Sequence, residues 1–215
     1  MTVTEMKSWF NILQDKYGST YYTDGEISQF FQRAQIEFIS KMLPGGRMVE
    51  NLELSQDSIS KISPLIYELP FQNMSSTGVV TKANLQSALT VLNNTALLWR
   101  PLSIGWVLNG QYRPVKFVRH NDRWEFAVNF FKKPSLTNPK VRETYNSYIV
   151  EPTNIGAKLY FTLLKYPNKV DIAGAVNSDL PDFTHDEIVS IALELTGIAS
   201  RDTALAQLLQ LKNNG

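Results

Sequence analysis

The feature that most constrains the fold is a hairpin signal inside a long strand-like region. The strand-like runs of this region are 97–99, 104–108, 115–118 and 124–130. The pair Asn109-Gly110 lies between two of them, and both residues tolerate the positive φ values that a type I′ turn requires. Another turn is expected at 120–122. The centre of the chain is therefore predicted to form an antiparallel meander.

A second hairpin is predicted further along the chain. The runs 145–150 and 158–166 are strand-like, and the segment 152–156 between them contains proline, asparagine and glycine. Upstream of the meander the pattern is weaker, with one strand expected at 63–69 and polar loop residues at 72–78. The total is five or six strands, mostly antiparallel.

Both ends of the chain have the pattern of helices. Three threonines precede a glutamate by three residues, the spacing of a capping box, in which each side chain binds a free backbone N–H of the other residue. The three pairs are Thr2 with Glu5, Thr23 with Glu26 and Thr184 with Glu187. Apolar residues at helical spacing follow each pair. Gly18 and Pro44 are expected to end the first two helices, Gly197 to bend or stop the third, and Ser200 to cap a short last helix.

These segments predict an α+β fold. It consists of an N-terminal helical hairpin (1–46), a central, mostly antiparallel β-sheet or sandwich (47–176) and C-terminal helices (177–215). At 215 residues with 43% hydrophobic residues, the chain is long enough to bury its own core as one domain. We therefore expect these three segments to form a single domain.

Composition excludes several classes of site. The chain has no cysteine, which removes disulfides, cysteine-bound metals and thiol nucleophiles. Its two histidines, His120 and His185, are expected at a hairpin tip and on the surface of a capped first helical turn. No phosphate-binding loop or nucleophile elbow occurs. We expect no catalytic residue, cofactor or metal, and the protein is not expected to be an enzyme, although dispersed carboxylates of a hydrolase stay a distant alternative.

Four acidic residues near the last helix raise the question of a cation site. They are Asp179, Asp182, Asp186 and Glu187. The spacing of a calcium-binding loop is missing, so linker and helix-cap roles are the preferred interpretation. No apolar run reaches the 18 residues of a membrane span, and the polar N-terminal segment does not have the pattern of a signal peptide. We expect a reducing, aqueous compartment and no membrane partner.

A stretch rich in basic and aromatic residues is the one candidate binding surface. Its basic members are Arg113, Lys116, Arg119, Arg123, Lys132, Lys133, Lys140 and Arg142. Alternation of charged and aromatic residues is typical of a single-strand-binding sheet, but it is equally the pattern of a half-buried strand with one face in water. We prefer the interpretation that these charges lie on the solvent-facing side of half-buried strands. If the charges function, contact with phosphate or with protein is favoured over base recognition.

Several stretches resemble a known group of structural proteins. They are Arg113–Asp122, Phe131–Pro134, Leu164–Pro167 and Leu180–Val189. These resemble structural proteins of crAss-like and related short-tailed bacteriophages, specifically a neck or tail ring protein. The segments Thr23–Ile27 and Ala34–Phe38 are similar to the helical hairpin that opens many head-to-tail connector subunits. The order of helices, sheet and helices is similar to the tail-tube adaptor beneath the portal.

The resemblance implies a virion protein at the head-tail interface or in the tail, assembled in the host cytoplasm. It would form a ring of twelve identical subunits that joins the portal to other ring or tail proteins around the DNA channel, with packaged DNA passing through the lumen. Such rings arise from head-to-tail contacts that close, so two different faces of the chain must be complementary. The alternative function is a nucleic-acid-binding module that uses the basic strands 111–142.

The near-neutral total charge of +1 conceals a segregation along the chain. Residues 1–60 carry 5 basic and 8 acidic side chains, and residues 170–215 carry 2 and 7. Residues 111–169 carry 11 basic and 4 acidic side chains. Acidic helical ends thus flank a basic sheet, an arrangement that favours assembly of basic faces against acidic faces.

Overall fold

The structure is a computed structural model that describes residues 1–16, 22–43, 56–73, 76–93, 96–118, 129, 133–154 and 156–200. The chain divides into two compact units. A helical unit takes residues 1–45, 54–65 and 167–215, and a sandwich unit takes residues 46–53 and 66–166. The predicted α+β class is confirmed, with helices at both ends of the chain and two mostly antiparallel sheets packed together in the sandwich.

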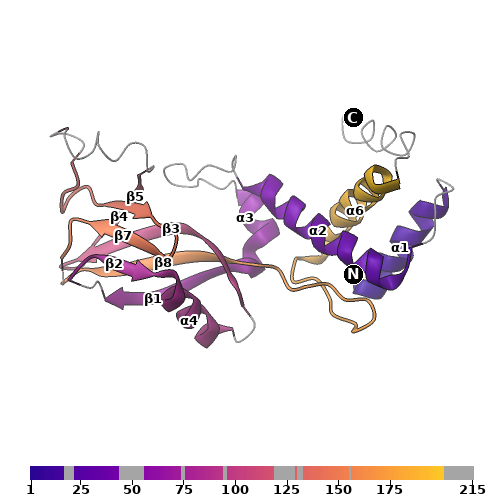
Figure 1. Cartoon of the computed structure of the whole chain (residues 1–215), viewed down its shortest axis with the longest axis horizontal. Coiled ribbons are helices and arrows are strands. Elements are labelled where there is room, and N and C mark those ends of the chain that lie inside the picture. Colours follow the sequence, from indigo (N-terminus) through magenta and orange to yellow (C-terminus); the bar gives the residue numbers. More distant parts are fainter. Residues whose placement is uncertain are drawn as a thin grey trace. The chain divides into compact units, whose positions relative to one another are not determined.

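The helical unit is built from four helices and two short 3₁₀ turns in its described residues (Figure 1). Their bounds are α1 Val3–Lys16, α2 Asp24–Met42, α3 Gln56–Ile62, η1 Ser63–Leu65, η3 Asp182–Thr184 and α6 His185–Ser200. The C-terminal helix α6 packs on both α1 and α2. The two ends of the chain therefore share one core.

Two of the three predicted capping boxes form. Glu5 accepts from the backbone N–H of Thr2 at 2.7 Å, and the Thr2 hydroxyl accepts from the backbone N–H of Glu5. Thr23 and Glu26 make the same reciprocal pair at the start of α2. These side chains satisfy backbone N–H groups that the helix itself leaves without acceptors.

The third predicted box, Thr184 with Glu187, is wrong. The Thr184 hydroxyl donates to the carbonyl of Pro181 at 2.7 Å instead, because a 3₁₀ turn precedes α6 and turns this side chain inward. Gly197 does not end the helix either, since α6 continues to Ser200. The short helix expected after Ser200 lies outside the described residues.

The core of the helical unit forms where apolar stripes of α1, α2 and α6 meet. Phe10 and Phe31 pack edge to face with ring centroids 5.7 Å apart. Gln35, fully buried on α2, accepts from the Ser178 hydroxyl at 2.7 Å and ties the segment before α6 to this core. A buried amide without such a partner would destabilise the unit.

In its described residues, the sandwich unit has two four-stranded sheets and one helix, α4 Lys82–Leu92. Sheet A has the order β1-β8-β3-β4, and sheet B has the order β2-β7-β6-β5. The strands are β1 Ile66–Asn73, β2 Val79–Thr81, β3 Leu98–Leu108, β4 Gln111–Pro114, β5 Lys116–Phe117, β6 Lys140–Glu143, β7 Ser147–Glu151 and β8 Lys158–Lys165. All pairs are antiparallel except β5 with β6.

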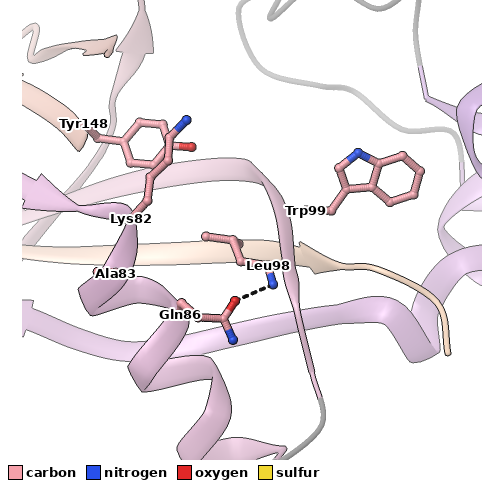
Figure 2. A pocket seen from close by; sticks show the side chains of 6 residues that line it. All are labelled: Lys82, Ala83, Gln86, Leu98, Trp99 and Tyr148. Carbon is pink, nitrogen blue, oxygen red and sulfur yellow. Dashed lines mark hydrogen bonds between the residues drawn. The ribbon is translucent and has the colours of Figure 1, made fainter. Parts of the chain in front are cut away.

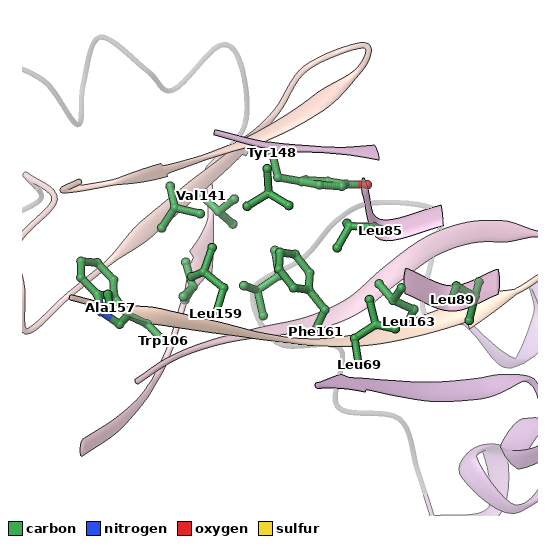
Figure 3. Close-up of a cluster of buried hydrophobic side chains, with 14 of the residues drawn as sticks. Leu69, Leu85, Leu89, Trp106, Val141, Tyr148, Ala157, Leu159, Phe161 and Leu163 are labelled. Carbon is green, nitrogen blue, oxygen red and sulfur yellow. The ribbon is translucent and has the colours of Figure 1, made fainter. Parts of the chain in front are cut away.

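The core of the sandwich lies between its two sheets (Figure 3). Trp106, Leu159 and Phe161 of sheet A meet Val141 and Tyr148 of sheet B. Leucines of α4 also join this cluster. Inward-facing residues alternate along the strands with outward ones, as two sheets packed face to face require.

The central hairpin is confirmed, and the second hairpin is wrong. Asn109 (φ 51°) and Gly110 (φ 76°) form the turn between β3 and β4. By contrast, β7 and β8 do not pair with each other: β7 lies between β2 and β6 in sheet B, and β8 lies between β1 and β3 in sheet A. Their connection, which includes residues 152–154, passes from one sheet to the other. Of the predicted strand 124–130, only Asn129 is among the described residues, and it is not in a strand.

Candidate functional site

The predicted basic residues that the structure describes gather at one side of the sandwich. Of the eight, Arg119, Arg123 and Lys132 lie outside the described residues. Arg113 is on β4, Lys116 on β5, and Lys140 and Arg142 on β6, while Lys133 lies in the connection that leads to β6. We call these five residues the basic edge, and they are Arg113, Lys116, Lys133, Lys140 and Arg142.

The basic edge forms where the chain crosses from sheet A to sheet B. After β4, buried Val115 donates its N–H to the carbonyl of Ile104 at 2.9 Å and remains attached to sheet A. The next two residues pair with β6 in parallel, with Lys116 opposite Lys140 and Phe117 opposite Val141. This register turns Phe117 toward the core and places two lysines side by side on the outer face.

The connection 133–139 closes this edge. Ser135 and Asn138 form a tight turn through reciprocal backbone hydrogen bonds. Arg113 donates a guanidinium N–H to the carbonyl of Thr137 at 3.3 Å, and the backbone N–H of Lys116 donates to the carbonyl of Pro139 at 3.2 Å. Residues from β4, β5 and the loop are therefore held together by hydrogen bonds.

The five cations differ in their access to solvent. Lys140 is only 7% exposed, and Arg142 lies 3.8 Å from the carboxylate of Glu151, so these two contribute little to a binding surface. Lys133 is exposed, and Arg113 and Lys116 are half-buried. Leu136 precedes Thr137, the hydrogen-bond partner of Arg113, and is a large apolar residue that is 48% exposed. Tyr112 is 58% exposed, but it lies on the other face of sheet A, because Arg113 pairs with the core residue Trp106 and Tyr112 pairs with Val107. Arginine is enriched in protein-binding surfaces, whereas lysine is depleted in them.

A surface pocket of about 290 Å³ is the second candidate in the sandwich (Figure 2). Its lining residues are Lys82, Ala83, Gln86, Leu98, Trp99 and Tyr148. The polar groups around it bind one another. Gln86 accepts from the backbone N–H of Leu98 at 2.7 Å and donates to the carbonyl of Ala96 at 2.8 Å, as Figure 2 shows for the first of these bonds.

The charged groups of this pocket are also internally paired. Lys82 bonds to the carboxylate of Glu143 and lies 5.4 Å from the ring centroid of Tyr148. The Tyr148 hydroxyl donates to the same carboxylate. Burial, together with the negative charge of Glu143, raises the pKa of the Tyr148 phenol, so this hydroxyl stays protonated at neutral pH. The pocket thus holds α4 against the sheet, and its polar atoms serve the fold.

His185 is not on the surface, contrary to the prediction. It is 2% exposed, and its Nε2 lies 3.0 Å from the carbonyl of Leu180. The 3₁₀ turn before α6 accounts for the difference, because it moves His185 under the preceding chain. Burial lowers the pKa of this imidazole, and the nearby N-terminal amino group lowers it further, while Asp182, whose carboxylate lies 3.7 Å from Nδ1, opposes the shift.

The four acidic residues near α6 do not converge on a cation site. Asp179 accepts two hydrogen bonds from Asn168, and Asp182 pairs with the N-terminal amino group at 2.7 Å. Asp186 and Glu187 are exposed in the first turn of α6, where the helix dipole favours anions. Across the part of the chain that the structure describes, no group of three or more potential ligands could hold a metal.

Three of these acidic residues are exposed and lie close in sequence to an exposed aromatic side chain. Phe183, in the 3₁₀ turn, is 64% exposed, and Asp182, Asp186 and Glu187 are exposed beside it in sequence. We call Asp182, Phe183, Asp186 and Glu187 the acidic knob. Sequence reasoning identified the carboxylates but missed Phe183, which an amphipathic pattern assigns to a core as readily as to the surface.

The two units carry opposite net charge. The helical unit has 8 basic and 13 acidic residues, a net charge of −5, and the sandwich unit has 13 basic and 7 acidic residues, a net charge of +6. The segregation seen along the sequence is therefore a segregation between folded units.

No helix within the described ranges is long and apolar enough to cross a membrane. No protein-family model matches the chain, and no curated protein is similar enough to it to count as a relative.

Proposed function

We propose that this protein is a virion structural protein, one subunit of a ring in the head-to-tail connector or tail of a short-tailed phage. The resemblance of its sequence to neck and tail ring proteins supports the proposal. The structural observation that carries it is the opposite net charge of the two units, −5 and +6. A ring subunit needs two different, complementary faces, and oppositely charged units supply them.

The partners of such a subunit are identical copies in a ring of twelve, the portal protein, and other ring or tail proteins. The protein would be located in the virion, at the head-tail interface or in the tail, and would be assembled in the host cytoplasm. The role needs no catalytic residue, cofactor or metal. Packaged DNA would pass through the lumen of the ring.

Sedimentation velocity and negative-stain electron microscopy of the purified chain test the proposal. We expect concentration-dependent assembly into closed rings, alone or on the portal protein of the same phage. A chain that stays monomeric at all concentrations, both alone and mixed with that portal protein, would overturn the proposal.

A nucleic-acid-binding module is the second candidate function, and the basic edge is the observation that favours it. Exposed Lys133, together with half-buried Arg113 and Lys116, supplies cations of the kind that contact phosphates. Binding to phosphates would weaken steeply with salt because condensed counterions are released. A fluorescence-anisotropy titration of single-stranded and double-stranded DNA at several salt concentrations measures this directly.

A further inference from the structure

We propose that the basic edge of one copy docks against the acidic knob of a second copy. The inference rests on the proposed function and names the two surfaces that would meet within the ring. Each surface belongs to a different unit of the chain, so every copy carries both halves of the contact.

Charge complementarity carries the first step of the argument. The net charges of −5 and +6 nearly cancel when a helical unit of one copy meets a sandwich unit of another. Copies that meet with like units repel each other, and copies that meet with unlike units attract. Electrostatics of this kind fixes register and suppresses wrong pairings.

The accessible side chains carry the second step. On the basic edge, Arg113 is hydrogen-bonded to Thr137, and Leu136, which precedes Thr137, is an exposed apolar residue. Lys133 is an exposed cation of the same edge. An apolar residue accompanied by cations suits a partner that presents an apolar anchor accompanied by anions.

The acidic knob has that composition. Phe183 is the exposed apolar anchor, and Asp186 and Glu187 follow it in the first turn of α6. Asp182 is exposed as well, although it already pairs with the N-terminal amino group of its own copy. Burying Phe183 against Leu136 of a neighbour would remove two exposed apolar side chains from water.

The presence of two oppositely charged surfaces on one chain favours a second copy over DNA as the partner. DNA would use the basic edge alone and leave the acidic knob without a role. A contact between two different surfaces is head-to-tail, and repetition of such a contact closes into a ring when its rotation permits.

Two neutralising variants test the inference. The edge variant carries Arg113→Gln, Lys116→Gln and Lys133→Gln, and the knob variant carries Asp186→Asn and Glu187→Gln. Each variant loses one half of the contact and keeps the other. We expect each alone to assemble with a dissociation constant at least about tenfold higher than that of the wild type, because several close charge pairs are lost.

Mixing the two variants gives the decisive result. The intact knob of the edge variant can bind the intact edge of the knob variant, and no further copy can add. An equimolar mixture should therefore give 1:1 dimers by mass photometry or sedimentation velocity, which a contact between two identical surfaces cannot produce. Dimers would also demonstrate that both variants are folded.

A matched pair of single variants provides the control. Lys133→Gln and Lys158→Gln each remove one exposed lysine from the sandwich unit, but Lys158 lies on β8, away from the basic edge. We expect Lys133→Gln to weaken assembly and Lys158→Gln to leave it unchanged within error. Equal effects of the two would mean that only net charge matters, and the docking inference would be wrong.

The outcomes separate this inference from the function on which it rests. If the wild type forms rings and both variants form them equally well, the docking surfaces are wrong and the ring function stands. If the wild type never assembles, alone or with the portal protein, the ring function itself fails. If the edge variant assembles normally but loses salt-dependent DNA binding, the basic edge is a nucleic-acid surface and the docking inference is overturned.

Discussion

The helical unit draws its core from both ends of the chain, whereas the described strands of the sandwich come from one continuous stretch, 66–165. In the helical unit, α6 (His185–Ser200) packs on α1 (Val3–Lys16) and α2 (Asp24–Met42), which are far from it in sequence. The helical unit cannot be completed until the whole chain is present, but the sandwich can. The two units therefore have separate cores although they belong to one chain. Each of the following predictions compares the two units or tests one of them.

The largest effects are expected from truncating the two cores. Phe161→Ala empties the space between the sheets, and Phe31→Ala removes the aromatic partner of Phe10 between α1 and α2. Each should lower the free energy of unfolding of its own unit by about 3–5 kcal/mol. Hydrogen exchange with mass spectrometry should show faster exchange in the mutated unit only. Equal loss of protection in both units after either substitution would show that they unfold as one.

A smaller loss of stability is expected from substituting a glycine in a turn of the sandwich unit. Gly78 has φ +69°, and an added Cβ would lie 2.4 Å from the carbonyl oxygen of Val150. Gly110 has a similar φ, +76°, but open space around it. Gly78→Ala should therefore cost about 3 kcal/mol, and Gly110→Ala about 1 kcal/mol from backbone strain alone. Chemical denaturation followed by tryptophan fluorescence compares them, and equal losses would contradict the steric argument.

Removing a helix cap should lower the free energy of unfolding by about 1 kcal/mol or less, and the loss should differ between the two units. Thr23→Ala removes a reciprocal capping box in the helical unit, and its cost is expected to be about 1 kcal/mol. Thr81 caps α4 of the sandwich through a single bond from the N–H of Asn84, so Thr81→Ala should cost about half as much. Thermal unfolding by circular dichroism measures both. A larger effect for Thr81→Ala would contradict the ranking.

The smallest effect is expected from pH, and only in the helical unit. Burial lowers the pKa of His185 below its usual 6.5, so the unfolded chain binds a proton more readily than the folded one. The contribution of His185 to the free energy of unfolding is fully present above about pH 6.5. It declines as the pH falls through that value toward the pKa of the folded state. Denaturant titrations at pH 7.5 and 5.5 should show a loss for the wild type that His185→Gln reduces. An unchanged pH dependence in the variant would sink this explanation.

Local chemistry was predictable from the sequence. The boxes at Thr2 and Thr23 and the turn at Asn109-Gly110 form as expected, since each depends on residues within four positions of one another. A short spacing is not sufficient, since the box expected at Thr184 is replaced by a bond to the carbonyl of Pro181. The failure of the second hairpin involves distant partners. Runs 145–150 and 158–166 have the pattern of a hairpin, yet the sandwich core assigns β7 and β8 to different sheets.

Two further features were not predicted, and both depend on contacts between distant segments of the chain. Helix α4 was not predicted, because its apolar residues, Leu85 and Leu89 among them, are few and are buried only against the sheets. The sequence identified five described cations of the basic edge, but not that Lys140 is buried while Lys133 is exposed. Access of this kind depends on how strands from distant segments pair.

The pairing of Ile66 with Leu164 has a consequence for how this chain can change over evolutionary time. The chain leaves the helical unit just before β1 and returns just after β8, and these two strands are antiparallel neighbours. The stretch between them is thus an insertion whose entry and exit are adjacent. Loops within it can lengthen, and the whole module can be exchanged, while the helical unit still has only a short gap to bridge.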